Sequence, residues 1–143
     1  MMIHYVDPSA WIKRHFLELG SDSVNALFAT GIRAACCELG LLEMIATVAR
    51  KSHAESLADQ IQISIIDNIR ADFRLFFNVS LDSARIEKAI ELARRHRLRT
   101  VDAVHLACAM SLTETHSVSI LSSDMELLAA ARAEGLAPLD PCS

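Results

Sequence analysis

Four carboxylates in this chain stand where acidic side chains can bind ligands, at predicted strand ends or on predicted helices, and these are Asp7, Glu43, Asp102 and Asp124. Asp7 follows the β-favouring run 2–6, and Asp124 follows the alternating run 117–121. Asp102 lies in the first turn of an apolar helix expected around 98–110, and Glu43 lies on a helix expected over 39–50. If they converge, they form a site for a cation.

Each acid also has an ordinary structural explanation. Asp7 before Pro8 is typical of a helix start, with aspartate at the N-cap and proline in the first turn. Asp102 follows Thr100, a plausible N-cap, and its negative charge suits the positive end of the helix dipole. Glu43 lies off the apolar stripe of its helix, as a solvent-exposed glutamate does. One acid alone therefore indicates little, and only the positions of all four relative to one another can indicate a site.

Alternating strand and helix signals predict an α/β fold with a mostly parallel central sheet. The predicted strands are 2–6, 32–37, 76–79, 117–121 and 136–139. The predicted helices are 11–19, 21–30, 39–50, 53–72, 83–96, 98–110 and 124–133. In such folds ligands collect at the carboxyl ends of the strands. Four carboxylates gathered there repel by several kcal/mol unless divalent cations compensate them, and oxygen ligands favour Mg²⁺ or Mn²⁺.

Polar residues mark several boundaries between these elements. The segment 80–82 is expected to cap the helix that follows it. Ser123 and Glu126 fit a capping box, with Asp124 at the first helical position. Asp72 is expected on the solvated side of its helix.

The length of 143 residues, with 52% hydrophobic and 22% charged residues, predicts a single domain over 1–143. The net charge of −4 argues against holding nucleic acid through the overall field, although a local basic patch remains compatible with it. The four cysteines match neither a disulfide framework nor a zinc motif. Without a signal peptide or an apolar run of about 18 residues, no membrane partner is expected, and the cytoplasm is the expected location.

Basic side chains that could contact phosphates are Lys13, Arg14, Arg95, Arg97 and Arg99. The run 94–97 ends a predicted helix, where positive charge commonly complements the helix dipole, and phosphate contact is the alternative. His105 follows Asp102 by three residues. We expect it to pack or to form hydrogen bonds, and we do not assign it as a ligand or a general base.

Four segments resemble, in order and spacing, the four acidic motifs of the PIN domain family. They are 5–14 (YVDPSAWIKR), 42–44 (LEM), 101–107 (VDAVHLA) and 121–124 (LSSD). The resemblance covers essentially the whole chain, and the third segment is the most specific. The length also resembles that of the single-domain VapC toxins of bacterial toxin–antitoxin pairs.

This resemblance implies a three-layer α/β/α sandwich and a Mg²⁺-dependent endoribonuclease, with Mn²⁺ as a second possible ion. It assigns the four acids as metal ligands and catalytic residues, and Ser9 and Ser122 as supporting hydroxyls. It also implies an RNA substrate and a cognate antitoxin that suppresses cleavage. Two alternatives remain at this point: a PIN-like module that binds RNA or protein without cutting, and a structure-specific DNA nuclease.

The predicted helices between 11 and 30 and between 39 and 72 carry more apolar residues than one sheet face covers. Oligomerisation is a common use for such an excess. We therefore expect a homodimer. The resemblance further implies that the antitoxin's C-terminal segment lies in a groove near these helices, in some cases sending an arginine toward the acids.

Overall fold

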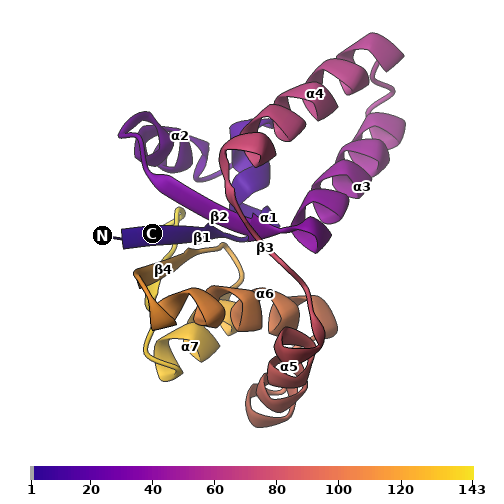
Figure 1. The fold of residues 1–143 in the computed structure, drawn as a ribbon. Coiled ribbons are helices and arrows are strands. Elements are labelled where there is room, and N and C mark those ends of the chain that lie inside the picture. Colours follow the sequence, from indigo (N-terminus) through magenta and orange to yellow (C-terminus); the bar gives the residue numbers. More distant parts are fainter. Residues whose placement is uncertain (1) are drawn as a thin grey trace.

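The computed structural model describes residues 2–143, which fold around a five-stranded sheet of order β3-β2-β1-β4-β5 (Figure 1). The strands are β1 (Met2–Val6), β2 (Arg33–Cys37), β3 (Phe77–Val79), β4 (Ser117–Leu121) and β5 (Ala137–Leu139). Every neighbouring pair is parallel. Parallel strands require crossover connections, and helices supply them here.

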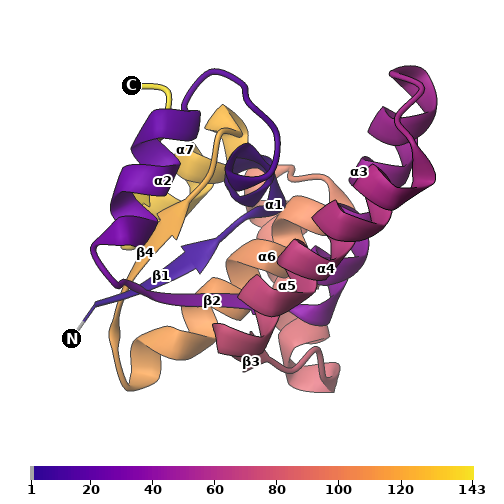
Figure 2. The same ribbon diagram turned by 90° about the horizontal axis from the view of Figure 1, so that it is seen from above.

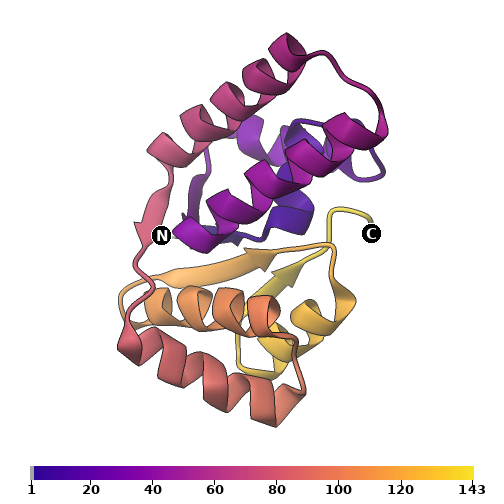
Figure 3. The same ribbon diagram turned by 90° about the vertical axis from the view of Figure 1, so that its right-hand side faces the viewer.

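Helices cover both faces of the sheet, as Figures 1 and 3 show. One layer contains α1 (Pro8–Trp11), η1 (Ile12–Arg14), α2 (Ser21–Ala29), α3 (Glu38–Ala54) and α4 (Asp59–Leu75). The other contains α5 (Ser83–His96), α6 (Thr100–Ser111), the short η2 (Leu112–Glu114) and α7 (Met125–Ala133). The α/β fold predicted from the sequence is therefore confirmed. Within residues 2–143, no helix is both long and apolar enough to cross a membrane.

Helix α6 is the central helix of its layer. Every residue from 103 to 109 is buried, and the helix packs against β2, β4, α5 and α7. A helix that is apolar nearly all round has this place in a core, because every face finds a partner. Its first turn, which carries Asp102, is consequently fixed relative to the sheet.

The order of the strands places β1 beside β4. From β1 the chain adds β2 and β3 on one side, and it later returns to add β4 and β5 on the other. Val6 and Leu121 are register partners at the carboxyl ends, where the backbone N–H of Asp7 donates to the carbonyl of Leu121 at 2.9 Å. A reversal of this kind opens a crevice at the carboxyl ends of the two central strands.

Two predicted helices end where the sequence pattern did not indicate. The helix expected over 11–19 ends at Arg14, and the chain then turns through Gly20, which has a φ of 93°. The helix expected over 53–72 is interrupted because α3 extends to Ala54 and closes with Ser56 in the left-handed conformation. The N–H of Leu57 then donates to the carbonyl of Ser52 at 2.9 Å, a Schellman ending achieved without glycine.

Some predicted caps are confirmed and others are wrong. Asp82 caps α5 by accepting from the N–H of Arg85 at 3.0 Å. Asp124, and not Ser123, is the N-cap of α7. Thr100 is the first residue of α6 and not its cap, and no side chain caps that helix.

Asp72 does not face solvent as predicted. Its carboxylate accepts hydrogen bonds from Trp11 Nε1 at 2.9 Å and from Arg14 Nε at 3.0 Å, and it pairs with His15 Nε2 at 2.9 Å. These contacts join α4 to the end of the first helical segment. The prediction failed because the partners lie 57 to 61 residues away in the sequence.

Candidate active site

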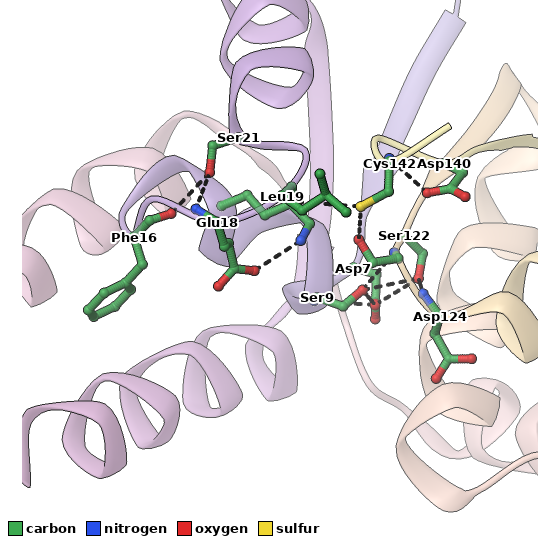
Figure 4. A network of polar contacts seen from close by, with 12 residues as sticks. Asp7, Ser9, Phe16, Glu18, Leu19, Ser21, Ser122, Asp124, Asp140 and Cys142 are labelled. Carbon is green, nitrogen blue, oxygen red and sulfur yellow. Dashed lines mark hydrogen bonds and ion pairs between the residues drawn. The ribbon is translucent and has the colours of Figure 1, made fainter. Parts of the chain in front are cut away.

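Asp7 lies in a network of hydroxyl groups at the ends of β1 and β4 (Figure 4). Its Oδ2 accepts from the hydroxyl of Ser9, from the N–H of Ser9 at 3.3 Å and from Ser122 Oγ at 3.0 Å. The two serine hydroxyls are 3.2 Å apart. The structure therefore brings together Asp7 and the two serines that were expected to support it. Oδ1 of Asp7 does not share these contacts and lies 3.9 Å from His105 Nε2.

Asp124 is held in a similar way, with one oxygen committed to local structure. Its Oδ1 accepts from the N–H groups of Glu126 at 2.9 Å and Leu127 at 3.1 Å, which caps α7. Its own N–H donates to Ser122 Oγ at 3.0 Å, so one serine orients both Asp7 and Asp124. Asp124 can therefore be both a helix cap and a metal ligand, because a carboxylate can cap a helix with one oxygen and bind a cation with the other.

Asp102 reaches the same place from the first turn of α6. Burial raises the pKa of its carboxyl group, and the charges of Asp124 and Asp7 raise it further, to about 6. Like charges have this effect only at short range, and the carboxyl group of Asp102 is within hydrogen-bonding distance of Asp124, so the aspartates at the starts of α1, α6 and α7 face one another. Nearby His105 offsets only part of the effect.

Glu43 faces this group from α3 across the crevice and contacts it through His105. Glu43 Oε1 lies 2.5 Å from His105 Nε2, and its side chain is 29% exposed. His105 is fully buried, and its Nδ1 lies 2.8 Å from the hydroxyl of Tyr5. The hydrogen-bonding role expected for His105 is confirmed. Tyr5 was not predicted, although its place two residues before Asp7 on a buried strand was a signal that could have suggested it.

The charges around His105 also affect its protonation. Burial by itself lowers the pKa of the imidazole, but hydrogen bonds to Cys37 and Glu43 and the charge of Asp7 raise it above its ordinary value. An ionised carboxylate only accepts hydrogen bonds, so Nε2 carries the proton in the bond to Glu43. The imidazole is therefore a donor toward the acids.

The donor set fits a hard divalent cation. It consists of carboxylate oxygens with serine hydroxyls behind them, and the repulsion that raises the pKa of Asp102 is what a cation relieves. Softer donors of Cys36, Cys37 and His105 lie within 4.8 Å of one another nearby. The hydroxyl of Tyr5 lies among them, at 3.4 Å from Cys37 Sγ and 3.9 Å from Cys36 Sγ, so these groups already have partners.

The five basic side chains considered for phosphate contact differ in their availability. Lys13 is buried and pairs with Glu18 at 3.0 Å, and Arg14 is paired with Asp72. Arg95 forms hydrogen bonds with Glu91 and Glu134. Arg97 and Arg99 are exposed in the connection between α5 and α6. Among the described residues, Arg97 and Arg99 are therefore the two of the five without a carboxylate partner, and Arg99 precedes Asp102 by three residues in the sequence.

The PIN domain family matches residues 4–135 of this chain. Two proteins of Mycobacterium tuberculosis, ribonucleases VapC45 and VapC49, are each 31% identical over 149 residues, covering 99% of this chain and 100% of their own. A toxin–antitoxin complex from Klebsiella pneumoniae matches with a TM-score of 0.69 and 16% identity, covering 96% of this chain and 97% of that one. VapBC2 from Rickettsia felis matches with a TM-score of 0.68 and 12% identity, covering 97% and 98%. The chain therefore belongs to the PIN domain family.

Proposed function

We propose that this protein is a Mg²⁺-dependent endoribonuclease, the toxin of a VapBC-like toxin–antitoxin pair acting in the cytoplasm. The observation that carries the proposal is the meeting of Asp7, Asp102 and Asp124 from three elements, with the pKa of Asp102 raised to about 6 by burial and by the other two. The names of the two ribonucleases at 31% identity support the same reaction class.

In this proposal, the four acids bind the cation, and the serine network and the N-cap of α7 orient Asp7 and Asp124. Asp7 Oδ1 and Asp124 Oδ2 are the oxygens left over by the serine network and by the α7 cap. Asp102 adds a carboxylate from the first turn of α6, and Glu43 adds one from the opposite layer, either to bind the cation or to orient water. When bound, Mg²⁺ or Mn²⁺ supplies Lewis acidity to water and to the scissile phosphate. No side chain has to act as a covalent nucleophile.

The RNA backbone is proposed to pass over Arg97 and Arg99. Arg97 lies in the left-handed turn that ends α5, with a φ of 55°, and Arg99 precedes α6 by one residue. Both are exposed and belong to the short connection that leads to Asp102. We leave Lys13, Arg14 and Arg95 out of this surface, because their charges are already paired with carboxylates.

The proposed partners are an antitoxin and a second copy of this chain. Helices α3 and α4 extend beyond the sheet in Figures 1 and 2, and they expose large apolar side chains. These are Leu42 (63% exposed), Ile61 (50%), Ile63 (57%) and Leu75 (86%). Removing such a surface from water favours association. The toxin–antitoxin complexes among the structural matches support an antitoxin as one occupant.

Cleavage is tested with purified protein and a mixed-sequence RNA oligonucleotide, in Mg²⁺, in Mn²⁺ and in a chelator, with single-stranded and duplex DNA of the same sequence alongside. We expect internal cuts in RNA with either metal and none in the chelator. Preferential cutting of DNA would favour the DNA nuclease, and binding of RNA without cutting would favour the inactive module.

Association is tested separately from cleavage. Light scattering at tens of micromolar is expected to give the mass of a dimer, and a monomer would refute the homodimer. A short reading frame immediately upstream is expected to encode the antitoxin. If its purified product neither binds this chain nor suppresses RNA cleavage, the toxin–antitoxin proposal fails while the nuclease proposal stands.

A further inference from the structure

Glu43 differs from the other three acids in how it is held. Asp7 and Asp124 are fixed by serines and backbone N–H groups next to them, and Asp102 lies at the start of a buried helix. Glu43 lies on α3, in the opposite layer from α6 (Figure 3), and no backbone N–H in the described part of the chain donates to its carboxylate. The hydrogen bond to His105 is what fixes its side chain. A flexible glutamate costs rotamer entropy each time it must bind a ligand.

His105 is itself held on several sides. It is fully buried, its Nδ1 is bonded to Tyr5 at 2.8 Å, and the Tyr5 hydroxyl in turn donates to Cys37 Sγ at 3.4 Å. Gly40 of α3 faces the same space, where a Cβ atom would collide with the sulfur of Cys36 and lie 3.4 Å from Cε1 of His105. The absence of a side chain at this position lets α3 approach α6 closely enough for the Glu43 bond.

We propose that His105 and Tyr5 are positioning residues of the metal site, with Tyr5 orienting the imidazole and the Nε2–H of His105 holding Glu43 toward Asp7. The chain of contacts spans β1, α6 and α3, so one buried side chain connects the two helices that carry Asp102 and Glu43 with the strand that ends just before Asp7. Both ring nitrogens are occupied, so His105 is not a ligand. The inference rests on the proposed function, because it needs a cation between these acids.

The proposal gives Glu43 the kind of support that metal ligands receive from outer hydrogen bonds, whose loss typically lowers metal affinity about 10- to 100-fold. A histidine that served only the core would act differently. Its removal would lower the stability of the fold, yet the folded protein would bind metal as before. Metal affinity therefore separates the two roles, whereas loss of activity alone does not.

The test is calorimetric titration of the purified protein with Mn²⁺, without RNA, on the parent and four variants. His105→Leu removes both hydrogen bonds, and we expect Mn²⁺ binding about tenfold weaker. His105→Gln keeps an N–H donor near the position of Nε2 and is expected to recover most of the affinity. Tyr5→Phe frees the imidazole and should weaken binding less than His105→Leu does. Val104→Ala is the matched control, since it removes buried volume one residue away but has no polar atom in the chain of contacts.

The outcomes are distinguishable. If the parent binds Mn²⁺ and His105→Leu, folded by circular dichroism, binds it equally well, the positioning role is overturned and the proposed function stands. If His105→Leu does not fold, His105→Gln and Tyr5→Phe decide, and equal affinity of Tyr5→Phe and the parent overturns the role of Tyr5. If Val104→Ala weakens binding as much as His105→Leu, the effect is structural and the proposal fails. If the parent binds no Mn²⁺, the metal site itself is wrong.

Discussion

Two partly buried carboxylates in this protein, Asp72 and Asp102, differ in the charges that surround them. At Asp72, burial by itself raises the pKa, but hydrogen bonds from His15, Arg14 and Trp11 outweigh it and hold the pKa well below its usual range. At Asp102, burial raises the pKa and neighbouring carboxylates raise it further, to about 6. The same side chain is therefore stabilised as an anion in one place and destabilised as an anion in the other.

Asp72 is a structural carboxylate, whereas Asp102 belongs to the proposed metal site. Asp72 has its cations within the fold, so its charge contributes to stability and needs nothing from outside. The carboxylates around Asp102 are only partly compensated by positive charges of the protein, so their repulsion opposes folding. Groups that destabilise the fold in this way are typical of sites that bind a ligand. The following variants test this difference, beginning with the largest expected effect.

Asp102→Asn is expected to abolish metal-dependent cleavage while leaving the fold intact. The change is nearly isosteric and removes repulsion from Asp124 and Asp7, so without metal the melting temperature should hold or rise slightly. RNA cleavage at neutral pH checks the expected loss of activity, and thermal unfolding at the same pH checks the expected stability. A variant that cuts RNA at the parent's rate in Mg²⁺ would show that the site is assigned wrongly.

Glu43→Gln is expected to reduce the cleavage rate by orders of magnitude, through lost metal binding or water orientation. If Glu43 were only a surface residue, the change would alter the free energy of unfolding by about 0.5 kcal/mol or less and leave the rate alone. Glu38→Gln, at the exposed first position of the same helix, is the control and should be mild. Rates of Glu43→Gln within twofold of the parent would remove Glu43 from the site.

Asp72→Asn is expected to lower the free energy of unfolding by about 2 kcal/mol at pH 7, because Arg14 loses its counter-charge and Trp11 and His15 lose an anionic hydrogen-bond partner. The folded variant should still cleave RNA, which is the reverse of Asp102→Asn. Since the folded-state pKa of Asp72 lies below the unfolded value of about 3.9, its stabilisation is present above that pH and is lost as the pH falls. The free energies of unfolding of parent and variant, measured in urea, should therefore approach each other as the pH falls below about 4.

The opposite pH dependence is expected at Asp102. Its folded-state pKa of about 6 lies above the unfolded value of about 3.9, so the folded state binds more protons between these values. Its contribution to stability therefore falls as the pH rises from 4 to 6. In a chelator, the stability of Asp102→Asn relative to the parent should grow over that range, and Mg²⁺ should stabilise the parent but not the variant. A constant difference would contradict the repulsion.

The smallest effect is expected at the proposed RNA surface. Arg99→Ala should weaken RNA binding about fivefold at low salt and reduce the salt dependence by about one phosphate contact. Binding is measured in a chelator to prevent cleavage. Arg95→Ala is the control, because its guanidinium already pairs with Glu134 and Glu91. Equal losses in both variants would indicate a general charge effect and not a contact at Arg99.

The sequence by itself determined the types and order of the secondary-structure elements and the places of the acids along them. Alternation over 117–121 and the caps around 80–82 are local signals, since the residues concerned lie within a few positions of each other. They therefore predicted an α/β fold and placed Asp7 and Asp124 at strand ends. The missed Schellman ending at Ser56 shows the limit of such signals, because nothing in the residue types required a turn there.

Only the tertiary structure decided which of these residues meet. The serine network joins Asp7 to Ser122 across 115 residues, and Tyr5 meets His105 across 100. Such contacts depend on strand order and helix packing, which local periodicity does not encode, because many topologies satisfy the same pattern. The ion-paired environment of Asp72 was missed for the same reason: the electrostatic environment of a carboxylate is set by neighbours that folding brings from elsewhere in the chain, here 57 to 61 residues away.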